Sequence, residues 1–238
     1  MSIYTMGIDV GSTASKCVIL KDGSEIVAKS LVAVGTGTSG PSRAIAQVLE
    51  NAGMTREQMD FVLATGYGRN SLDGLADMQM SELSCHAKGA AFLFPNVRTV
   101  VDIGGQDVKV LDVMARVLEV KVEELGDLGD KSTKEVGISS TCTVFAESEV
   151  ISQLAMGTNK CDIIHGIHKS VAGRVSGLCH RIGVRDDVVM TGGVAQNHGI
   201  VKALQEQLGH EIHTTPLTQY NGALGAALFA YQKALKNK

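Results

Sequence analysis

Short apolar runs alternate along the whole chain with segments whose apolar residues recur at helical spacing. We expect strands over 3–9, 16–20, 25–34, 61–64, 97–103 and 187–191, and helices over 42–51, 81–94, 144–156, 162–181, 196–208 and 222–235. The helix over 42–51 shows the pattern best, because Ile45, Val48 and Leu49 share one face and Gly53 follows as a stop. This alternation predicts an α/β protein whose sheets are mostly covered by helices.

Composition supports a folded protein and excludes several classes. The 238 residues are 44% hydrophobic and 20% charged, enough for one large domain or two small ones. The net charge is -3 and no stretch is strongly basic, so the charge pattern of a nucleic-acid binder is missing. Twenty-seven glycines against three prolines favour a protein with many close backbone approaches, as at phosphate sites.

The sequence predicts a cytoplasmic protein that does not enter a membrane. No apolar run has the length of a membrane span, and residues 1–4 do not begin a signal peptide. The five cysteines, at 17, 85, 142, 161 and 179, are scattered and form no Cys-x-x-Cys pair. They are therefore expected to be reduced thiols.

A strand that ends in Asp-x-Gly occurs twice. Residues 7–11 contain Asp9 and lead to Lys16, and residues 101–105 contain Asp102 and lead to Lys109. Duplication predicts two similar half-folds that face a shared cleft. Chance recurrence stays open at this point, because Asp and Gly are both common where strands end.

The turn after each of these aspartates could bind phosphate. Gly11 allows close backbone approach, and the hydroxyls of Ser12, Thr13 and Ser15 can donate hydrogen bonds to phosphate oxygens. Asp9 could hold Mg²⁺ through a water. An ordinary hairpin turn explains this motif equally well when it is taken alone.

Three further segments strengthen the phosphate interpretation. Residues 102–107 repeat the first construction with an added carboxylate, Asp107. A Gly192-Gly193 turn enters a helix, which suits an anion or an adenosine ribose, and residues 219–223 open the last helix similarly. We take Asp9, Asp102 and Asp107 as the catalytic candidates around Mg²⁺ and water, and the sequence does not separate their roles.

With these motifs in this order, the chain resembles the ATPase superfamily of actin, the Hsp70 chaperones and the sugar kinases. Within it, the chain is similar to the activator ATPases of 2-hydroxyacyl-CoA dehydratases and benzoyl-CoA reductases. The resemblance runs nearly end to end and rests on GIDVGSTASK (7–16), ATGYGRN (64–70), DIGGQD (102–107), SSTCTVFAESEV (139–150), GGVAQN (192–197) and QYNGALGAA (219–227).

The resemblance implies two actin-like, ribonuclease H-like domains, over 1–95 and 96–238, with ATP or ADP and Mg²⁺ in the cleft between them. It places the phosphates at Ser12 to Lys16 and at Gly104 to Gln106, and the adenosine near Gln196 and Gln219. The expected nucleotide-binding residues are Gly11, Ser12, Thr13, Ala14, Ser15, Lys16, Gly104, Gly105, Gln106, Gly192, Gly193, Gln196 and Gln219.

The resemblance also implies ATP-driven electron transfer. It predicts a homodimer that shares one [4Fe-4S] cluster, with Cys142 as a ligand, a reduced ferredoxin or flavodoxin as donor, and a 2-hydroxyacyl-CoA dehydratase as acceptor. Two alternatives stay open: a small-molecule kinase of the same superfamily, and a cluster-free nucleotide-dependent scaffold.

The chain departs from this family after about residue 110. The family continues there through a strand pair and a Cys-Ala-Ala-Gly-Thr-Gly-like segment, which supplies the second cluster cysteine. Here Val110 runs straight into Leu111, so a strand pattern turns helical without turn chemistry, and about 20 residues are missing. Either the protein lacks the segment or the written sequence omits it; the missing turn chemistry favours the second.

Two other patterns imitate functional motifs. Residues 35–40 spell Gly-x-Gly-x-x-Gly, but no acid ends the following strand, so we interpret them as a flexible loop rather than an NAD site. Cys161, His165 and His168 share one helix face, where an ordinary partly exposed face is favoured over zinc binding.

Overall fold

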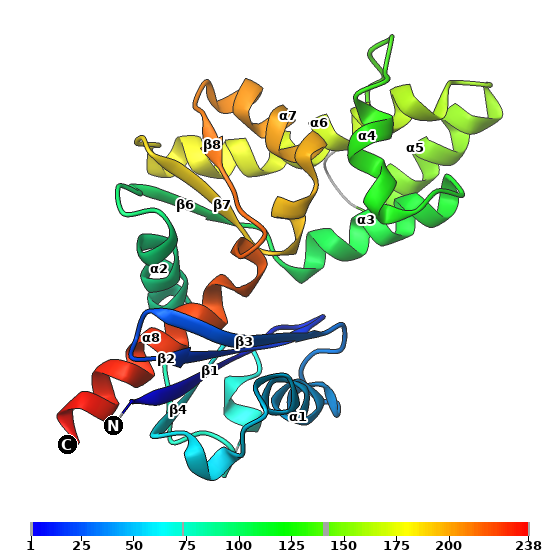
Figure 1. Ribbon diagram of the computed structural model, residues 1–238. Helices are drawn as coiled ribbons and strands as arrows, with labels where there is room; N and C mark the ends of the chain where they lie inside the picture. Colours follow the sequence, from blue (N-terminus) through cyan, green and yellow to red (C-terminus); the bar gives the residue numbers. More distant parts are fainter. Residues whose placement is uncertain (1, 73, 140–142, 238) are drawn as a thin grey trace.

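The computed structural model describes residues 2–72, 74–139 and 143–237, and Figure 1 shows the path of the chain. Cys142, the predicted cluster ligand, lies outside these residues. In the described part, no helix is both long and apolar enough to cross a membrane.

The first half of the chain forms a five-stranded sheet. Its strands are β1 (Tyr4–Val10), β2 (Ser15–Lys21), β3 (Glu25–Val32), β4 (Phe61–Thr65) and β5 (Met78–Gln79), in the order β3-β2-β1-β4-β5. The central strand β1 pairs antiparallel with β2 and parallel with β4. It is buried on both faces, which suits its largely apolar sequence.

Helices cover both faces of this sheet. Met6, Ile8 and Val10 of β1 pack with α1 (Gly40–Ala52), whose Gly53 stop adopts the expected left-handed conformation. The opposite face packs against α8 (Asn221–Lys236), so the last helix of the chain returns to the first sheet (Figure 1). Gly7 makes this packing possible, because a Cβ there would lie 2.0 Å from the carbonyl oxygen of Ala223.

Helix α2 (Glu82–Leu93) packs on α8 and leads into a second sheet. That sheet is parallel, with β6 (Thr99–Asp102), β7 (Val188–Thr191) and β8 (Ile212–His213) in the order β6-β7-β8. Its helices are α3 (Gly105–Val117), α4 (Leu125–Gly129), α5 (Thr143–Ala155), α6 (Lys160–Ile182) and α7 (His198–Leu208). Short 3-10 turns cover Arg56–Gln58, Arg69–Ser71, Val122–Glu124, Gly193–Gln196 and Thr218–Tyr220.

The two halves share a construction but differ in strand number. Strands β1 and β6 each end in Asp-x-Gly and each has a parallel neighbour, β4 or β7. Strand β1 also pairs with β2, whereas β6 is an edge strand of its sheet in the described part of the chain. Among the described residues, the second sheet therefore lacks counterparts of β2 and β3.

The expected switch from strand to helix near Val110 does not occur. Helix α3 already begins at Gly105, with Gly104 in the N-cap position, directly after β6. The glycine pair therefore supplies the break that was expected further along the chain, and residues 105–117 form one continuous helix. The strand expected over 97–103 accordingly spans only Thr99–Asp102.

Candidate functional site

One cavity of about 830 Å³ is lined by residues from both halves of the chain. It holds most of the residues that the sequence singled out. Those that line it are Asp9, Gly11, Ser12, Thr13, Ala14, Lys16, Asp102, Gly104, Gly105, Gly192, Gly193, Gln196 and Gln219. A cavity of this volume suits a ligand of nucleotide size.

Asp9 and Lys16 form an ion pair beside the first Asp-x-Gly turn. They are paired through Lys16 Nζ and Asp9 Oδ2, which are 3.3 Å apart, and both side chains are largely buried. The Asp9 carboxylate raises the pKa of Lys16, an effect larger than the opposing effect of burial. The other oxygen of Asp9, Oδ1, is buried and has no hydrogen-bond partner among the described residues. Such an orphaned acceptor favours a missing cation or donor at this place.

The first turn is braced by the loop that spells Gly-x-Gly-x-x-Gly. The Gly11 N–H donates to Ala14 O at 3.0 Å, and the Thr36 N–H donates to Gly11 O at 2.9 Å. A Cβ on Gly35 would lie 2.4 Å from Ser12 O, so this loop packs directly on the turn. Gly35 therefore serves backbone packing, which sequence reasoning missed. Ser15 points away from the cavity, since its hydroxyl donates to Val34 O at 2.9 Å.

The second turn approaches the first across the cavity. Asp102 Oδ1 accepts a hydrogen bond from Thr191 Oγ1 at 2.7 Å, which holds its carboxylate in place. A Cβ on Gly105 would lie 2.2 Å from Thr13 Oγ1. A side chain at position 105 would therefore have to displace the side chains of Ser12 and Thr13, so the glycine helps the turns of the two halves to lie this close. Gly192, with φ +86°, passes close to Ile103 O in the same way.

The structure does not bring every predicted site residue to this cavity. Asp107 lies in the first turn of α3, pairs with Arg174 of α6, and is not among the cavity residues. The early helix start turns it toward α6. The side chain of Gln106 lies outside the described part of the structure. Gln196 Nε2 lies 3.4 Å from Thr218 Oγ1.

Several cavity residues escaped sequence reasoning. His86 lines the cavity, whereas its neighbour Cys85 is fully buried. His86 Nδ1 lies 3.2 Å from Asp102 Oδ1, and Glu82 lies one helical turn before it. Burial raises the pKa of Glu82, and the charges of Asp9 and Asp102 raise it further. The only sequence signal was the i, i+4 spacing of Glu82 and His86 at a helix start.

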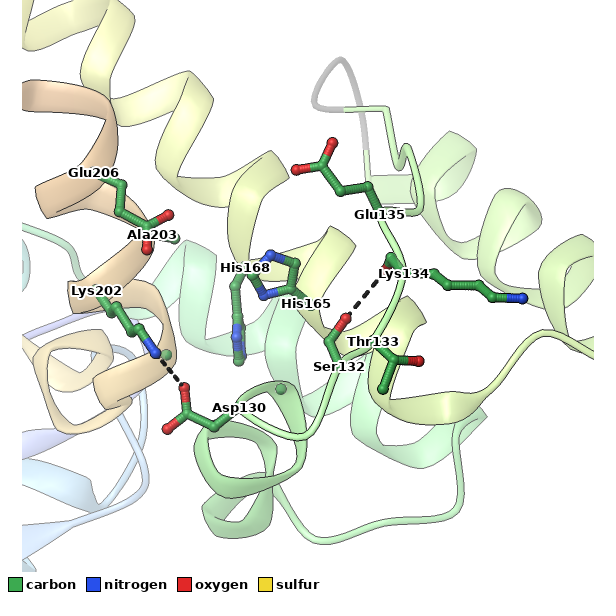
Figure 2. Close-up of a pocket in the computed structure, with 12 residues that line it drawn as sticks. Asp130, Ser132, Thr133, Lys134, Glu135, His165, His168, Lys202, Ala203 and Glu206 are labelled. Atoms are coloured by element: carbon green, nitrogen blue, oxygen red, sulfur yellow. Dashed lines mark hydrogen bonds and ion pairs between the residues drawn. The ribbon is translucent and has the colours of Figure 1, made fainter.

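A second cavity, of about 280 Å³, lies between residues 129–135 and helices α6 and α7 (Figure 2). Two of its charged groups pair with each other: Lys202 Nζ donates to Asp130 Oδ1 at 3.0 Å across its edge. His165 and His168 line it, but among the described residues they form no three-ligand group with Cys161. The face suggested for zinc therefore gains no support.

The fold defines the class of protein. Two strand–Asp–Gly halves around one cavity form the fold shared by the actin-like ATPases and the sugar kinases. A glucokinase of the ROK family from Streptomyces griseus, crystallised with glucose and AMPPNP, has this fold with a TM-score of 0.60, although it is only 13% identical; the likeness covers 96% of this chain and 99% of that one. That likeness concerns the fold alone.

The chain belongs to the BadF/BadG/BcrA/BcrD ATPase family, whose model matches residues 6–113 and 109–230. It is 68% identical over 260 residues to the (R)-2-hydroxyglutaryl-CoA dehydratase activating ATPase of Acidaminococcus fermentans, covering 99% of this chain and 100% of that protein. The activator of 2-hydroxyisocaproyl-CoA dehydratase from Clostridium difficile, solved with bound ADPNP, has a TM-score of 0.95 at 48% identity; 99% of this chain and 97% of that one are covered.

The comparisons also bear on the missing segment. The alignment with the Acidaminococcus protein spans 260 positions, whereas this chain has 238 residues, so the relative carries residues without a counterpart here. The two family matches meet at 109–113, inside α3. The shortened second sheet and the sequence departure thus fall at the same place.

Proposed function

We propose that the chain hydrolyses ATP in the shared cavity and thereby activates a 2-hydroxyacyl-CoA dehydratase. The observation that carries this proposal is the full-length similarity to a (R)-2-hydroxyglutaryl-CoA dehydratase activating ATPase, at 68% identity. The cavity supports it, since both Asp-x-Gly turns line it. The (R)-2-hydroxyglutaryl-CoA enzyme is therefore the first partner to test.

Each wall of the cavity has a role in this proposal. The backbone N–H groups of Gly11 to Ala14 and of Gly104 to Gly105 would donate to the phosphates, and Lys16 would add a positive charge. Gly192, Gly193, Gln196 and Gln219 would border the adenosine. With the proposed division at residue 95, Gly11 to Lys16 belong to the first domain, and the other cavity residues named here belong to the second. Helix α8 belongs to the second domain by sequence but packs on the sheet of the first.

Mg²⁺ fits the same cavity. Asp9 offers a buried oxygen without a partner in the described chain, and Asp102 faces the cavity from the opposite turn. Both are hard oxygen ligands of the kind that Mg²⁺ uses, directly or through water. When bound, the ion would neutralise charge on the phosphates. The chain's own contribution is to fix Asp102 through Thr191 and to hold Lys16 charged beside Asp9.

A [4Fe-4S] cluster does not fit the cysteines that the structure describes. A normal cluster needs four thiolates. Cys17 and Cys85 are fully buried, and burial raises the pKa of both thiols. Cys161 and Cys179 lie on α6, separated by about five helical turns. With Cys142 as the candidate ligand, a homodimer would supply two of the four thiolates. The shared cluster and the ferredoxin or flavodoxin donor therefore stay predictions.

Asp102→Asn tests the ATPase part of the proposal. Removing a carboxylate that would hold Mg²⁺ and water beside the phosphates should lower kcat for ATP hydrolysis by about 10²–10³-fold while the chain stays folded. Asp186→Asn is the matched control, because Asp186 pairs with His210 outside the cavity. Hydrolysis within a few-fold of normal in Asp102→Asn would contradict the site assignment.

The activator part is tested in the same anaerobic preparation. Addition of ATP and a low-potential reductant should switch on purified (R)-2-hydroxyglutaryl-CoA dehydratase, and iron and sulfide analysis should give four of each per dimer if a cluster is present. ATP hydrolysis without dehydratase activation or iron would leave a cluster-free ATPase and overturn the activator proposal.

A further inference from the structure

Three potential metal ligands meet where α2 approaches the end of β6. Glu82 and His86 stand one turn apart on α2, and Asp102 ends β6. One ligand atom from each side chain lies within 4.8 Å of the other two. No other such group exists among the described residues. We propose that Glu82, His86 and Asp102 bind a divalent transition-metal ion at the wall of the cavity, before and independently of nucleotide.

Carboxylates outnumber basic side chains around this group, although Lys16 also interacts electrostatically with Glu82 and Asp102. Asp9 is only 3% exposed, and one of its oxygens has no partner in the described chain. Its other oxygen and His86 Nε2 each lie 3.0 Å from the position of a Cβ on Gly222, so both border the same point. Lys16 pairs with Asp9, and no lysine or arginine of the described residues forms an ion pair with Glu82 or Asp102. A cation would relieve this excess of carboxylates.

Neighbouring residues hold two of the three ligands in position. Thr191 Oγ1 donates to Asp102 Oδ1 at 2.7 Å, and Asn221 Nδ2 donates to the His86 carbonyl oxygen at 2.9 Å. Supporting contacts of this kind orient ligands at metal sites. Asp102 has a second carboxylate oxygen, so binding here does not remove it from the proposed Mg²⁺ site.

The two carboxylates contact opposite ring nitrogens of His86: Asp102 Oδ1 lies 3.2 Å from Nδ1, and Glu82 Oε1 lies 3.9 Å from Nε2. The ligand atoms are therefore spread wider than one bound ion requires, and Glu82 must turn toward the nitrogen that binds the ion. Ligands bonded at about 2.0–2.2 Å stand roughly 3–3.5 Å apart around one ion. The Glu82 side chain is 44% exposed, so it has room to rotate inward. His86 is 13% exposed and more firmly placed. Binding of one ion by all three residues therefore requires mainly that the Glu82 side chain rotate.

The imidazole determines which ions suit the site. Mg²⁺ prefers oxygen ligands, whereas an imidazole nitrogen favours Zn²⁺, Fe²⁺ and related ions, with Mn²⁺ between these groups. A bound ion would join α2, which packs on the first half, to β6 of the second sheet. It would also reduce the repulsion between the cavity carboxylates and the phosphates of an entering nucleotide.

Mn²⁺ titration followed by electron paramagnetic resonance tests the proposal directly. The full chain, stripped of metal by a chelator and free of nucleotide, should bind Mn²⁺, and pulsed spectra should show a coupled ¹⁴N nucleus. His86→Gln should abolish that coupling and weaken binding at least about 10-fold. His180→Gln is the control, because His180 lies in a different helix, α6; it should change neither the ¹⁴N coupling nor the affinity for Mn²⁺. Glu82→Gln should also weaken the binding of Mn²⁺. If His86→Gln fails to fold, unchanged Mn²⁺ binding by Glu82→Gln would overturn the inference.

No binding of Mn²⁺ below about 1 mM, or an unchanged ¹⁴N coupling in His86→Gln, would overturn the inference. Binding of a fluorescent ATP analogue is measured in parallel on the same samples. Because the ion is titrated without nucleotide, loss of Mn²⁺ binding with intact ATP binding would refute this site alone. Intact Mn²⁺ binding without ATP binding would refute the proposed function alone.

Discussion

His168 illustrates how one buried side chain makes stability depend on pH. It is 1% exposed, and a Cβ on Gly129 or Gly199 would collide with its ring. Burial is the main cause that lowers its pKa from 6.5 to about 4, and His165 and His198 lower it further. The folded ring therefore stays neutral at pH values where the unfolded chain is already protonated.

We expect the free energy of unfolding to fall as the pH drops from about 6.5 to about 4. Over this window His168 is protonated in the unfolded state but neutral in the folded state. This difference lowers the free energy of unfolding by up to about 3 kcal/mol. Denaturant unfolding across this range measures the slope, and His168→Gln should flatten it. His180→Gln, near the end of the same helix, should leave it unchanged. An NMR titration that places the His168 pKa near 6.5 would contradict this expectation.

Helix packing in the first half of the chain depends on glycine. A Cβ on Gly225 of α8 would lie 1.8 Å from the carbonyl oxygen of Cys85 in α2. The two helix backbones therefore touch directly, and any side chain would separate them. This contact also positions α2, and with it the face that carries Glu82 and His86.

Gly225→Ala should lower the free energy of unfolding by at least about 2 kcal/mol, because backbone must move to admit the methyl group. Gly177→Ala is the matched control: Gly177 lies in α6, is exposed, and a Cβ there would meet no atom within 4 Å. That change should stabilise by about 0.5–1 kcal/mol through helix propensity. Equal effects of the two substitutions in urea unfolding would show that the helices are not in close contact.

The positions of helices and strands could be predicted from apolar periodicity where the periodic segment was long. Strand β1 and helix α1 are within three residues of their predicted bounds, since apolar spacing and the Gly53 stop act locally. The two-residue strands β5 and β8 and the short helix α4 were missed, because segments so short carry no periodic signal. The start of α3 was missed because the Gly104-Gly105 pair was interpreted as a turn between strands.

The candidate site was predictable only in its turns. Asp9, Asp102 and the glycines beside them belong to local motifs, so the sequence singled them out. Glu82 and His86 form no motif, and they reach the cavity only because α2 packs on α8. Asp107 belongs to a motif, yet α3 turns it toward Arg174. Tertiary packing decided these three positions.

Across the molecule, the two halves differ in how their leading strands are paired. Strand β1 lies between β2 and β4, whereas β6 pairs only with β7 in the described chain. Thr99 and Ile103 donate their N–H groups toward β7, to Asp187 O and Thr191 O at 3.2 and 3.1 Å. By the alternation of a strand, the N–H groups of Val100 and Asp102 point to the open edge.

Hydrogen exchange should therefore distinguish the two halves. The amides of Val100 and Asp102 should exchange at least about 10²-fold faster than that of Val101, which faces β7. In β1, Gly7 and Ile8 should both be protected, because a strand lies on each side. Equal protection of Val100 and Val101 would contradict the open edge and would mean that another strand covers it. Since the Acidaminococcus relative carries residues without a counterpart here, and the family has a strand pair after about residue 110, that segment would be the first candidate to supply such a strand.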